Sequence, residues 1–144
     1  MKESTMDVDK MNKETIEEFR ANEGRVGGMF EGAMLLLLHH LGAKSGTERV
    51  NPLMCRIEGD SWVVFASKAG APTNPDWYYN LIANSATTIE IGTETVAVTA
   101  RVAEGAERTR IWEATKAETP MFAEHEEKSG RQIPVIVLER ALSR

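Results

Sequence analysis

The sequence predicts a mainly β fold with peripheral helices (α+β), arranged as a compact antiparallel barrel or roll. Two observations carry this prediction. Six short segments have strand-like patterns, and glycine-containing turns join most of them, which favours hairpins over parallel crossovers. Segment 95–102 alternates between valine or alanine on one side and mainly polar residues on the other, as in a half-buried strand. At 144 residues, the chain is expected to form one domain over 1–144.

The N-terminal part is predicted to contain one helix. Residues 1–11 are polar and mixed in charge, and we expect them to form a flexible lead. Helix formers dominate 12–22, where Ile16 and Phe19 are spaced to share one face. The glycines of 24–32 end this helix and indicate an extended, closely packed connection.

Two hairpins are predicted next. The apolar run 33–41 is short enough to be a buried strand. A second strand covers 49–57, where Pro52 indicates a sheet edge or a bulge. A turn at 59–60 then leads into the apolar strand 62–65.

The stretch 66–84 combines a loop of small residues with a well-marked helix. Asn74 can cap the free amides, Pro75 suits the first helical position, and Asn84 is a natural stop. A loop of small residues with one lysine, placed before a helix start, lets a flat or anionic ligand approach backbone amides. The alternative is an ordinary surface connection that contains glycine and proline.

The C-terminal part adds the remaining elements of the predicted fold. Strands at 87–91 and 95–102 are joined by a two-residue turn, and a helix covers 105–119. A broken segment over 120–130 leads to the final strand at 133–138.

Charge and cysteine content exclude several classes of protein. The net charge of -5 argues against nucleic-acid partners, because phosphate contacts need a basic surface. Cys55 is the only cysteine, which fits a reducing, cytoplasmic setting without disulfides. The longest apolar run, 33–38, is far shorter than the ~20 residues that span a bilayer. We therefore expect no transmembrane segment. Residues 1–13 also lack the apolar core of a signal peptide.

Basic residues beside the glycine-flanked turns are candidates for an anion site. Lys44 lies in the turn GAKSG at 42–46, Arg49 follows it, and Lys68 lies in the small-residue loop. Backbone amides around Ser45 could also contact a phosphate or carboxylate. The turn lacks the spacing of a P-loop, and solvated turn charges are the alternative interpretation.

Histidines and serines give no metal site and no nucleophile. His39 and His40 are adjacent, so on a strand they point to opposite faces and cannot chelate one metal together. His125 is the only other histidine, and no metal is predicted. Ser45 and Ser67 lack an evident base in the sequence.

Four short segments together carry a resemblance to a known family. They are FRANEGRVGGMFEG at 19–32, GAKSGTERVNPLM at 42–54, ASKAGAP with PDWYYNL over 66–81, and RQIPVIVLE at 131–139. Each is weak alone. In order and spacing the set resembles the deazaflavin-dependent nitroreductase family, actinobacterial enzymes that use coenzyme F420.

The resemblance implies a split β-barrel of the flavin-reductase type and a groove that holds the deazaflavin. The expected cofactor-binding residues are Pro52, Leu53, Met54, Ala66, Ser67, Lys68, Ala69, Gly70, Trp77 and Asn80. The phosphate and oligoglutamate tail would meet Lys44, Ser45 and Arg49, since cations attract carboxylates and phosphate. FMN is the alternative cofactor.

The implied activity is that of an F420H2-dependent oxidoreductase, which transfers a hydride from reduced deazaflavin to a quinone, enone or nitroaromatic acceptor. Phe122 and His125 are the expected substrate contacts, standing where relatives that reduce such acceptors carry tyrosines. His125 is the candidate proton donor, and Ser67 is a second candidate catalytic residue.

Two further positions depart from the family pattern. Ala43 stands where the family often has an arginine beside Lys44, so a lower affinity for the tail is expected. His39 and His40 replace small hydroxyl residues on the first strand.

A non-catalytic F420-binding or carrier protein is the alternative function, and an FMN-binding relative is a third. The expected partners are a small-molecule electron acceptor and a second copy of the chain in a homodimer. The expected location is the cytoplasm, with peripheral membrane attachment if the acceptor is a lipid quinone.

Overall fold

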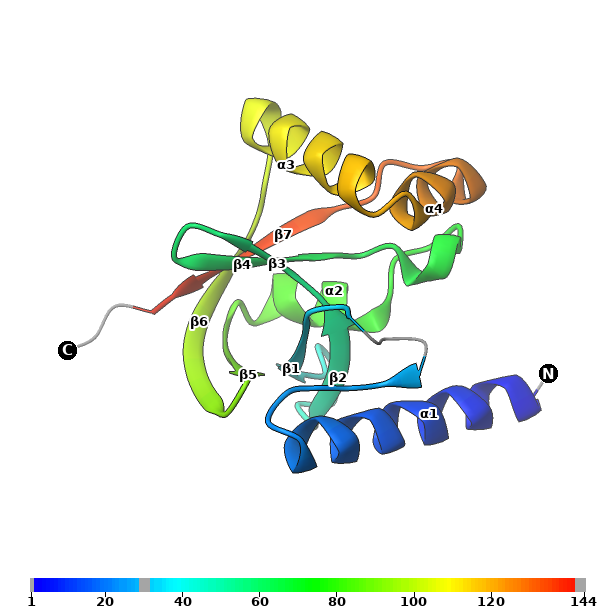
Figure 1. Ribbon diagram of the computed structural model, residues 1–144, viewed down its shortest axis with the longest axis vertical. Helices are drawn as coiled ribbons and strands as arrows, with labels where there is room; N and C mark the ends of the chain where they lie inside the picture. The colour runs from blue at the N-terminus through cyan, green and yellow to red at the C-terminus, as the bar shows by residue number, and fades with distance from the viewer. Residues whose placement is uncertain (1, 29–31, 142–144) are drawn as a thin grey trace.

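Seven antiparallel strands form one curled sheet, a half-barrel, in the computed structural model, which describes residues 2–28 and 32–141 (Figure 1). Of residues 2–9 and of Ala69, only the backbone is described. The strand order is β2-β1-β5-β6-β7-β4-β3. The strands are β1 Leu35–Leu41, β2 Glu48–Met54, β3 Arg56–Glu58, β4 Ser61–Phe65, β5 Ala86–Ile91, β6 Glu94–Val102 and β7 Val135–Arg140. All paired neighbours are antiparallel, which confirms the expected fold class.

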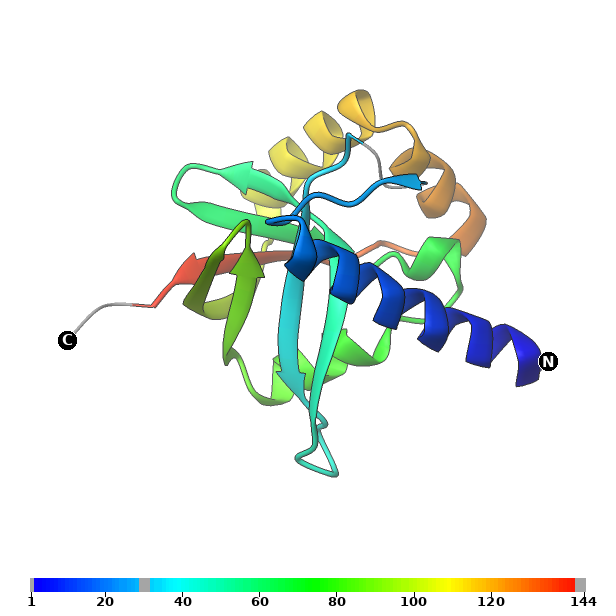
Figure 2. The ribbon, with the colours of Figure 1, turned by 60° about the horizontal axis from the view of Figure 1, so that its bottom comes forward.

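Four α-helices and one short 3₁₀ turn surround this sheet in the described part of the chain. They are α1 Lys2–Ala21, the 3₁₀ turn η2 Lys68–Gly70, α2 Asp76–Ala83, α3 Gly105–Glu118 and α4 Met121–Ser129. Figure 1 shows α3 and α4 together at the top and α1 at the bottom. In Figure 2, α1 crosses in front of β1 and β2. The buried ring of Phe19 fixes this crossing, because it packs with Leu35 and Leu37 of β1.

The last strand, β7, lies in the middle of the sheet between β6 and β4. Its residues Val135 to Leu138 are buried, so side chains on both faces of the strand are covered. Ile136 and Leu138 join the core that includes α2, whereas Val135 and Val137 join the core beneath α3 and α4. One strand therefore belongs to two apolar cores.

The core beneath α3 and α4 contains a cluster of three aromatic rings. The ring centroids of Phe65 and Phe122 are 5.0 Å apart, those of Phe65 and Trp112 5.6 Å, and those of Trp112 and Phe122 6.1 Å. The tilted and edge-on orientations are those that aromatic pairs favour. Because Phe65 ends β4 and Phe122 begins α4, this cluster fixes α4 against the sheet.

The expected second strand, 49–57, is in fact two strands, so the sheet has seven strands instead of six. The chain leaves β2 at Cys55, whose amide donates to the carbonyl of Met34 at 3.0 Å. It then forms β3 at the other end of the sheet order. β2 itself is an edge strand, as Pro52 indicates.

The backbone of the expected flexible lead is helical from Lys2 onward, as part of α1, and its flexibility stays a prediction. Two local expectations are corrected. The expected broken segment contains the regular helix α4, which ends at Gly130 in the left-handed conformation. Asn74 does not cap α2, because the N-cap is Pro75. Oδ1 of Asn74 instead accepts a hydrogen bond from Nη1 of Arg131 at 2.5 Å. Asn84 does end α2 as expected.

Candidate functional site

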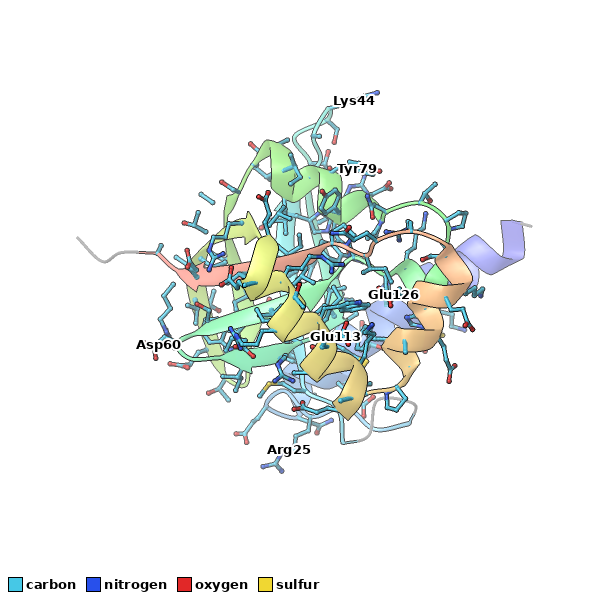
Figure 3. The ribbon with its side chains drawn as sticks, turned by 90° about the horizontal axis from the view of Figure 1, so that it is seen from above. Arg25, Lys44, Asp60, Tyr79, Glu113 and Glu126 are labelled. Atoms are coloured by element: carbon cyan, nitrogen blue, oxygen red, sulfur yellow. The ribbon has the colours of Figure 1, made fainter. Side chains whose placement is uncertain are left out.

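The residues expected to bind a cofactor or substrate come from four parts of the fold. Lys44 and Ser45 lie in the β1–β2 turn, and Arg49 to Met54 lie on β2. The segment 66–70 connects β4 to α2 and contains η2. Trp77 and Asn80 lie on α2, and Phe122 and His125 on α4. Figure 3 shows Lys44 and Tyr79 of α2 toward the same end of the molecule, with Arg25 at the opposite end.

A buried chain of hydrogen bonds fixes the β1–β2 turn against α2. Nε2 of His40 bonds Oδ1 of Asn51 at 2.7 Å, and Nδ2 of Asn80 bonds Nδ1 of His40 at 2.9 Å. Oδ1 of Asn80 then accepts from the amide of Ala43 at 2.9 Å. Burial lowers the pKa of His40, which keeps the ring neutral, as this pairing requires. The amide of Asn80 is thus used to position the turn that carries Lys44.

His39 points to the opposite face of β1 from His40, as expected for adjacent residues on a strand. Nδ1 of His39 lies 3.0 Å from Glu48 Oε2, and its Nε2 lies 2.7 Å from Glu90 Oε2. Arg20 of α1 also pairs with Glu90 at 2.6 Å. His39 and His40 therefore have separate roles in holding β1 to its surroundings, and neither points toward a shared ligand.

Lys44, Arg49 and Lys68 are exposed and form no side-chain ion pair or hydrogen bond within the described residues. By contrast, five other lysine and arginine side chains pair with carboxylates in the described part of the chain. They are Arg20, Arg56, Arg101, Arg110 and Lys116. In a protein of net charge -5, cations without carboxylate partners remain available to an anionic ligand.

The loop after β4 contains two neighbouring backbone amides that have no acceptor within the described residues, although Ser67 itself is buried. Ser67 is right-handed at φ -80° and ψ -30°, and Lys68 follows with φ +48°. A right-handed residue followed by a left-handed one forms a concave nest of amides that binds anions. Within the described residues, the amides of Ser67 and Lys68 donate no hydrogen bond. The carbonyls of these two residues accept from Gly70 and Ala71, which closes η2.

The same loop packs directly on α4. Gly70 has φ +86°, and a Cβ built on it would lie 3.0 Å from Cδ of Lys128 and 3.4 Å from Cα of His125. The ring of Phe122 lies edge-on to that of His125, with centroids 5.8 Å apart. The buried Nδ1 of His125 has no hydrogen-bond partner within the described residues. Burial and the charge of Lys128 lower the pKa of His125 below its ordinary value.

A cavity of about 350 Å³ lies where the β2–β3 corner meets α3 and α4. Its lining includes Met54, Cys55, Ile57, Phe65 and Phe122. Burial raises the pKa of the Cys55 thiol to about 12. The cavity therefore brings together Met54, expected on the cofactor side, and Phe122, expected on the substrate side, which are far apart in the sequence.

Three residues expected to bind the cofactor lie in or against the apolar core instead of lining an open groove, and the fully buried Ala66 is one of them. Trp77 is 5% exposed and packs with Leu36, Leu38 and Leu81. Leu53 is partly buried against the same core. A larger hollow of about 1260 Å³ between the end of α1 and the β5–β6 turn contains none of the expected site residues. Arg131 was not expected at the site, although the sequence segment that contains it carried part of the resemblance.

The fold defines a class of protein, the split β-barrel proteins. The heme storage protein HutZ of Vibrio cholerae aligns with a TM-score of 0.57 over 89% of each chain, at 16% identity. At that identity the likeness concerns the fold alone.

The family follows from closer relatives. Residues 11–140 match the F420H(2)-dependent quinone reductase family, and the chain belongs to this family. An F420H(2)-dependent quinone reductase of Mycobacterium tuberculosis is 34% identical over 126 residues, or 85% of each chain. The structure of an F420-H2 dependent reductase, FDR-A, is 38% identical, covers 73% of this chain and 93% of its own, and has a TM-score of 0.67. A domain-swapped dimer is 32% identical, with coverage of 92% and 98% and a TM-score of 0.69.

Family membership confirms the resemblance drawn from the four segments and makes the chain an F420-dependent reductase with coenzyme F420 as its cofactor. The residues present fit this cofactor, because its anionic tail needs cations and its planar head needs an apolar wall. Lys44, Arg49 and Lys68 are the cations that would meet the tail, and the amides of Ser67 and Lys68, which donate no hydrogen bond within the described residues, would be further donors. Within the described ranges, no helix combines the length and the apolar character needed to cross a membrane.

Replacing Gly70 by Ala should move α4 away from the loop. The left-handed φ costs about 1–2 kcal/mol for a residue with a Cβ, and the contact with Lys128 and His125 adds to this cost. Gly59→Ala is the matched control, since Gly59 has φ +60° but nothing within 4 Å of its would-be Cβ. Urea unfolding should show a larger loss for Gly70→Ala, and equal losses would contradict the close contact.

Proposed function

We propose that this chain transfers a hydride from F420H2 to a quinone that is bound in the cavity between the β2–β3 corner and α4. The observation that carries the proposal is the contact between the loop after β4, which is assigned to the cofactor, and α4, which lines the cavity. The loop with free amides touches α4 at Gly70, and α4 places Phe122 in the cavity. The lining combines apolar side chains with the polar groups of Arg56, Thr115, Glu118 and Thr119, so it offers a wall for a flat ring and hydrogen-bonding groups for its oxygens, which supports a quinone acceptor. Enones and nitroaromatics are further candidate acceptors.

The cofactor supplies the hydride, and the residues of this chain bind, orient and exclude water. Lys44 and Arg49 lie on one hairpin, where Arg49 is paired in register with His40 of β1. The relay through Asn80 fixes the turn that carries Lys44. We assign the phosphate and carboxylates of the tail to this hairpin. The planar head is assigned to β2 and the loop at Ser67 and Lys68, beside the cavity.

A proton donor is needed because two-electron reduction of a quinone leaves negative charge on an oxygen. His125 lies beside Phe122, and its unpartnered Nδ1 supports a role toward a bound acceptor. The backbone carbonyl of Ser67 is occupied, whereas its hydroxyl forms no hydrogen bond within the described residues. We assign the donor role to His125, and Ser67 is the second candidate.

The alternative is a carrier that binds F420 without turnover. The cavity beside the loop supports an enzyme, because a carrier needs no space for an acceptor. A homodimer is proposed as well, and the domain-swapped dimer among the structural neighbours supports it.

Mixing the protein with F420H2 and a short-chain naphthoquinone should restore the absorbance of oxidised F420, with no comparable rate for reduced FMN. Binding of F420 without turnover of a quinone, an enone or a nitroaromatic would favour the carrier.

Replacing Arg49 by Ala should weaken F420 binding. The substitution removes a charged hydrogen-bond donor worth roughly 1.5–3 kcal/mol, so the Kd should rise about ten- to hundredfold. The remaining binding should also be less sensitive to salt. Arg25→Ala removes the same charge at the opposite end of the molecule and should change neither quantity (Figure 3). Fluorescence titration with F420 at two salt concentrations measures both effects. Equal affinities for wild type and Arg49→Ala would exclude the assignment of Arg49 to the anionic tail.

The donor role of His125 predicts a pH dependence. The protonated ring donates best, and its pKa is lowered, so quinone turnover should fall as pH rises through a value below about 6.5. His125→Phe should flatten this profile while the Kd for F420 stays nearly constant. Turnover measured against pH for both proteins tests this, and superimposable profiles would exclude His125 as donor.

A further inference from the structure

Arg131 lies between α4 and β7, and its guanidinium is surrounded by oxygens of one segment, 66–74. The acceptors are the carbonyls of Ala66 (3.0 Å), Ser67 (3.3 Å), Ala71 (3.1 Å) and Thr73 (2.9 Å), with Oδ1 of Asn74 (2.5 Å). Nε and both terminal nitrogens take part. A lysine could not reproduce this set, because only the planar fork of arginine donates in several fixed directions.

Arg131 forms no ion pair within the described residues, unlike Arg20, Arg56, Arg101 and Arg110. Arg101, for example, contacts the carboxylates of Glu107 and Glu139 at 2.7 and 3.1 Å. Neutral carbonyl oxygens satisfy the donors of Arg131 but leave its positive charge uncompensated. That charge lies directly behind the loop that presents Ser67 and Lys68.

The hydrogen bonds of Arg131 also determine where the amides of the loop point. In a trans peptide, the N–H of one residue points away from the carbonyl of the preceding residue. The carbonyls of Ala66 and Ser67 point to the guanidinium, so the amides of Ser67 and Lys68 point away from it. Neither of these two amides donates a hydrogen bond within the described residues. By bonding the carbonyls on one side of the loop, Arg131 thus keeps the amides of the nest pointing to the other side, where they are available to an anion.

Arg131 also connects this loop to the acceptor side of the site. It follows the C-terminus of α4 directly, where Gly130 is left-handed, and its amide donates to Oγ of Ser129 at 3.3 Å. α4 carries Phe122 and His125 and contacts the loop at Gly70. A single side chain therefore bonds the cofactor loop to the end of the helix that forms the acceptor wall.

We infer that Arg131 is a positioning residue, which turns the amides of Ser67 and Lys68 toward an anionic or carbonyl group of the cofactor and fixes the loop against α4. This inference rests on the proposed function, since that function assigns the loop to the cofactor. Arg131 itself lies behind the loop, touches only protein oxygens, and acts through the backbone that it orients.

Hydrogen exchange of the protein without cofactor tests the positioning role independently of activity. The amides of Gly70 and Ala71 are bonded within η2 at 2.9 and 3.0 Å. In Arg131→Lys, which keeps the charge but loses the fork, these two amides should exchange at least about tenfold faster, because the loop opens locally. Arg101→Lys is the matched control and should leave them unchanged. Equal exchange in Arg131→Lys and wild type would overturn the inference.

Cofactor binding provides the second measurement. Arg131→Lys should raise the Kd for F420 about ten- to hundredfold, whereas Arg101→Lys should not. In Arg131→Ala, a low, non-denaturing concentration of guanidinium ion should restore part of the affinity, a rescue that general destabilisation would not give. An unchanged Kd in Arg131→Lys would overturn the inference. A wild-type protein that fails to bind F420 would instead overturn the proposed function, and the exchange result would still decide whether Arg131 holds the loop.

Discussion

The insertion of β7 between β6 and β4 is the interaction on which the rest of the structure depends. Without it, β1, β2, β5 and β6 form one sheet and the β3–β4 hairpin is a separate ribbon. β7 bonds to both, and its four buried residues complete the cores on its two faces. A two-stranded ribbon has little stability alone, so β3 and β4 depend on the last strand of the chain for their place. Because this pairing joins distant parts of the sequence, it also requires costly loop closure.

The site depends on the same strand. The loop that presents Ser67 and Lys68 leaves β4 where the amide of Ala66 donates to the carbonyl of Pro134, just before β7. Arg131, three residues earlier in the chain than Pro134, bonds the far part of that loop. The acceptor helix α4 ends immediately before Arg131. The loop proposed for the cofactor and the helix proposed as the acceptor wall are therefore both attached to one short connection, 130–135, and this attachment sets their relative position.

Local patterns predicted most of the strands, because alternation and glycine turns depend on neighbours in sequence. Where the prediction failed, a distant residue decided the outcome. Asn74 has the right type and position for a cap, but Arg131 binds its oxygen. The helix α4 has one buried residue, Phe122, and its place depends on rings from β4 and α3. The break at Cys55 depends on a bond to Met34.

The candidate site was likewise predictable only where its residues form a local pattern in the sequence. The sequence shows which cations exist, and the structure shows which of them have carboxylate partners. Lys44, Arg49 and Lys68 were found from their turns, because small residues beside a cation are a local pattern. Nothing local distinguishes Arg131 from the paired arginines, since its acceptors come from residues that lie about 60 positions earlier. The cavity likewise joins β2 to α4 and has no counterpart in one sequence segment.

The buried thiol in that cavity has a consequence for the durability of the enzyme. Quinones are electrophiles that alkylate thiolates, and Cys55 lines the space assigned to the acceptor. With the pKa of the thiol raised to about 12, very little thiolate is present at pH 7. Because alkylation needs the thiolate, an acceptor held in the proposed cavity would react only slowly with the single cysteine of the chain.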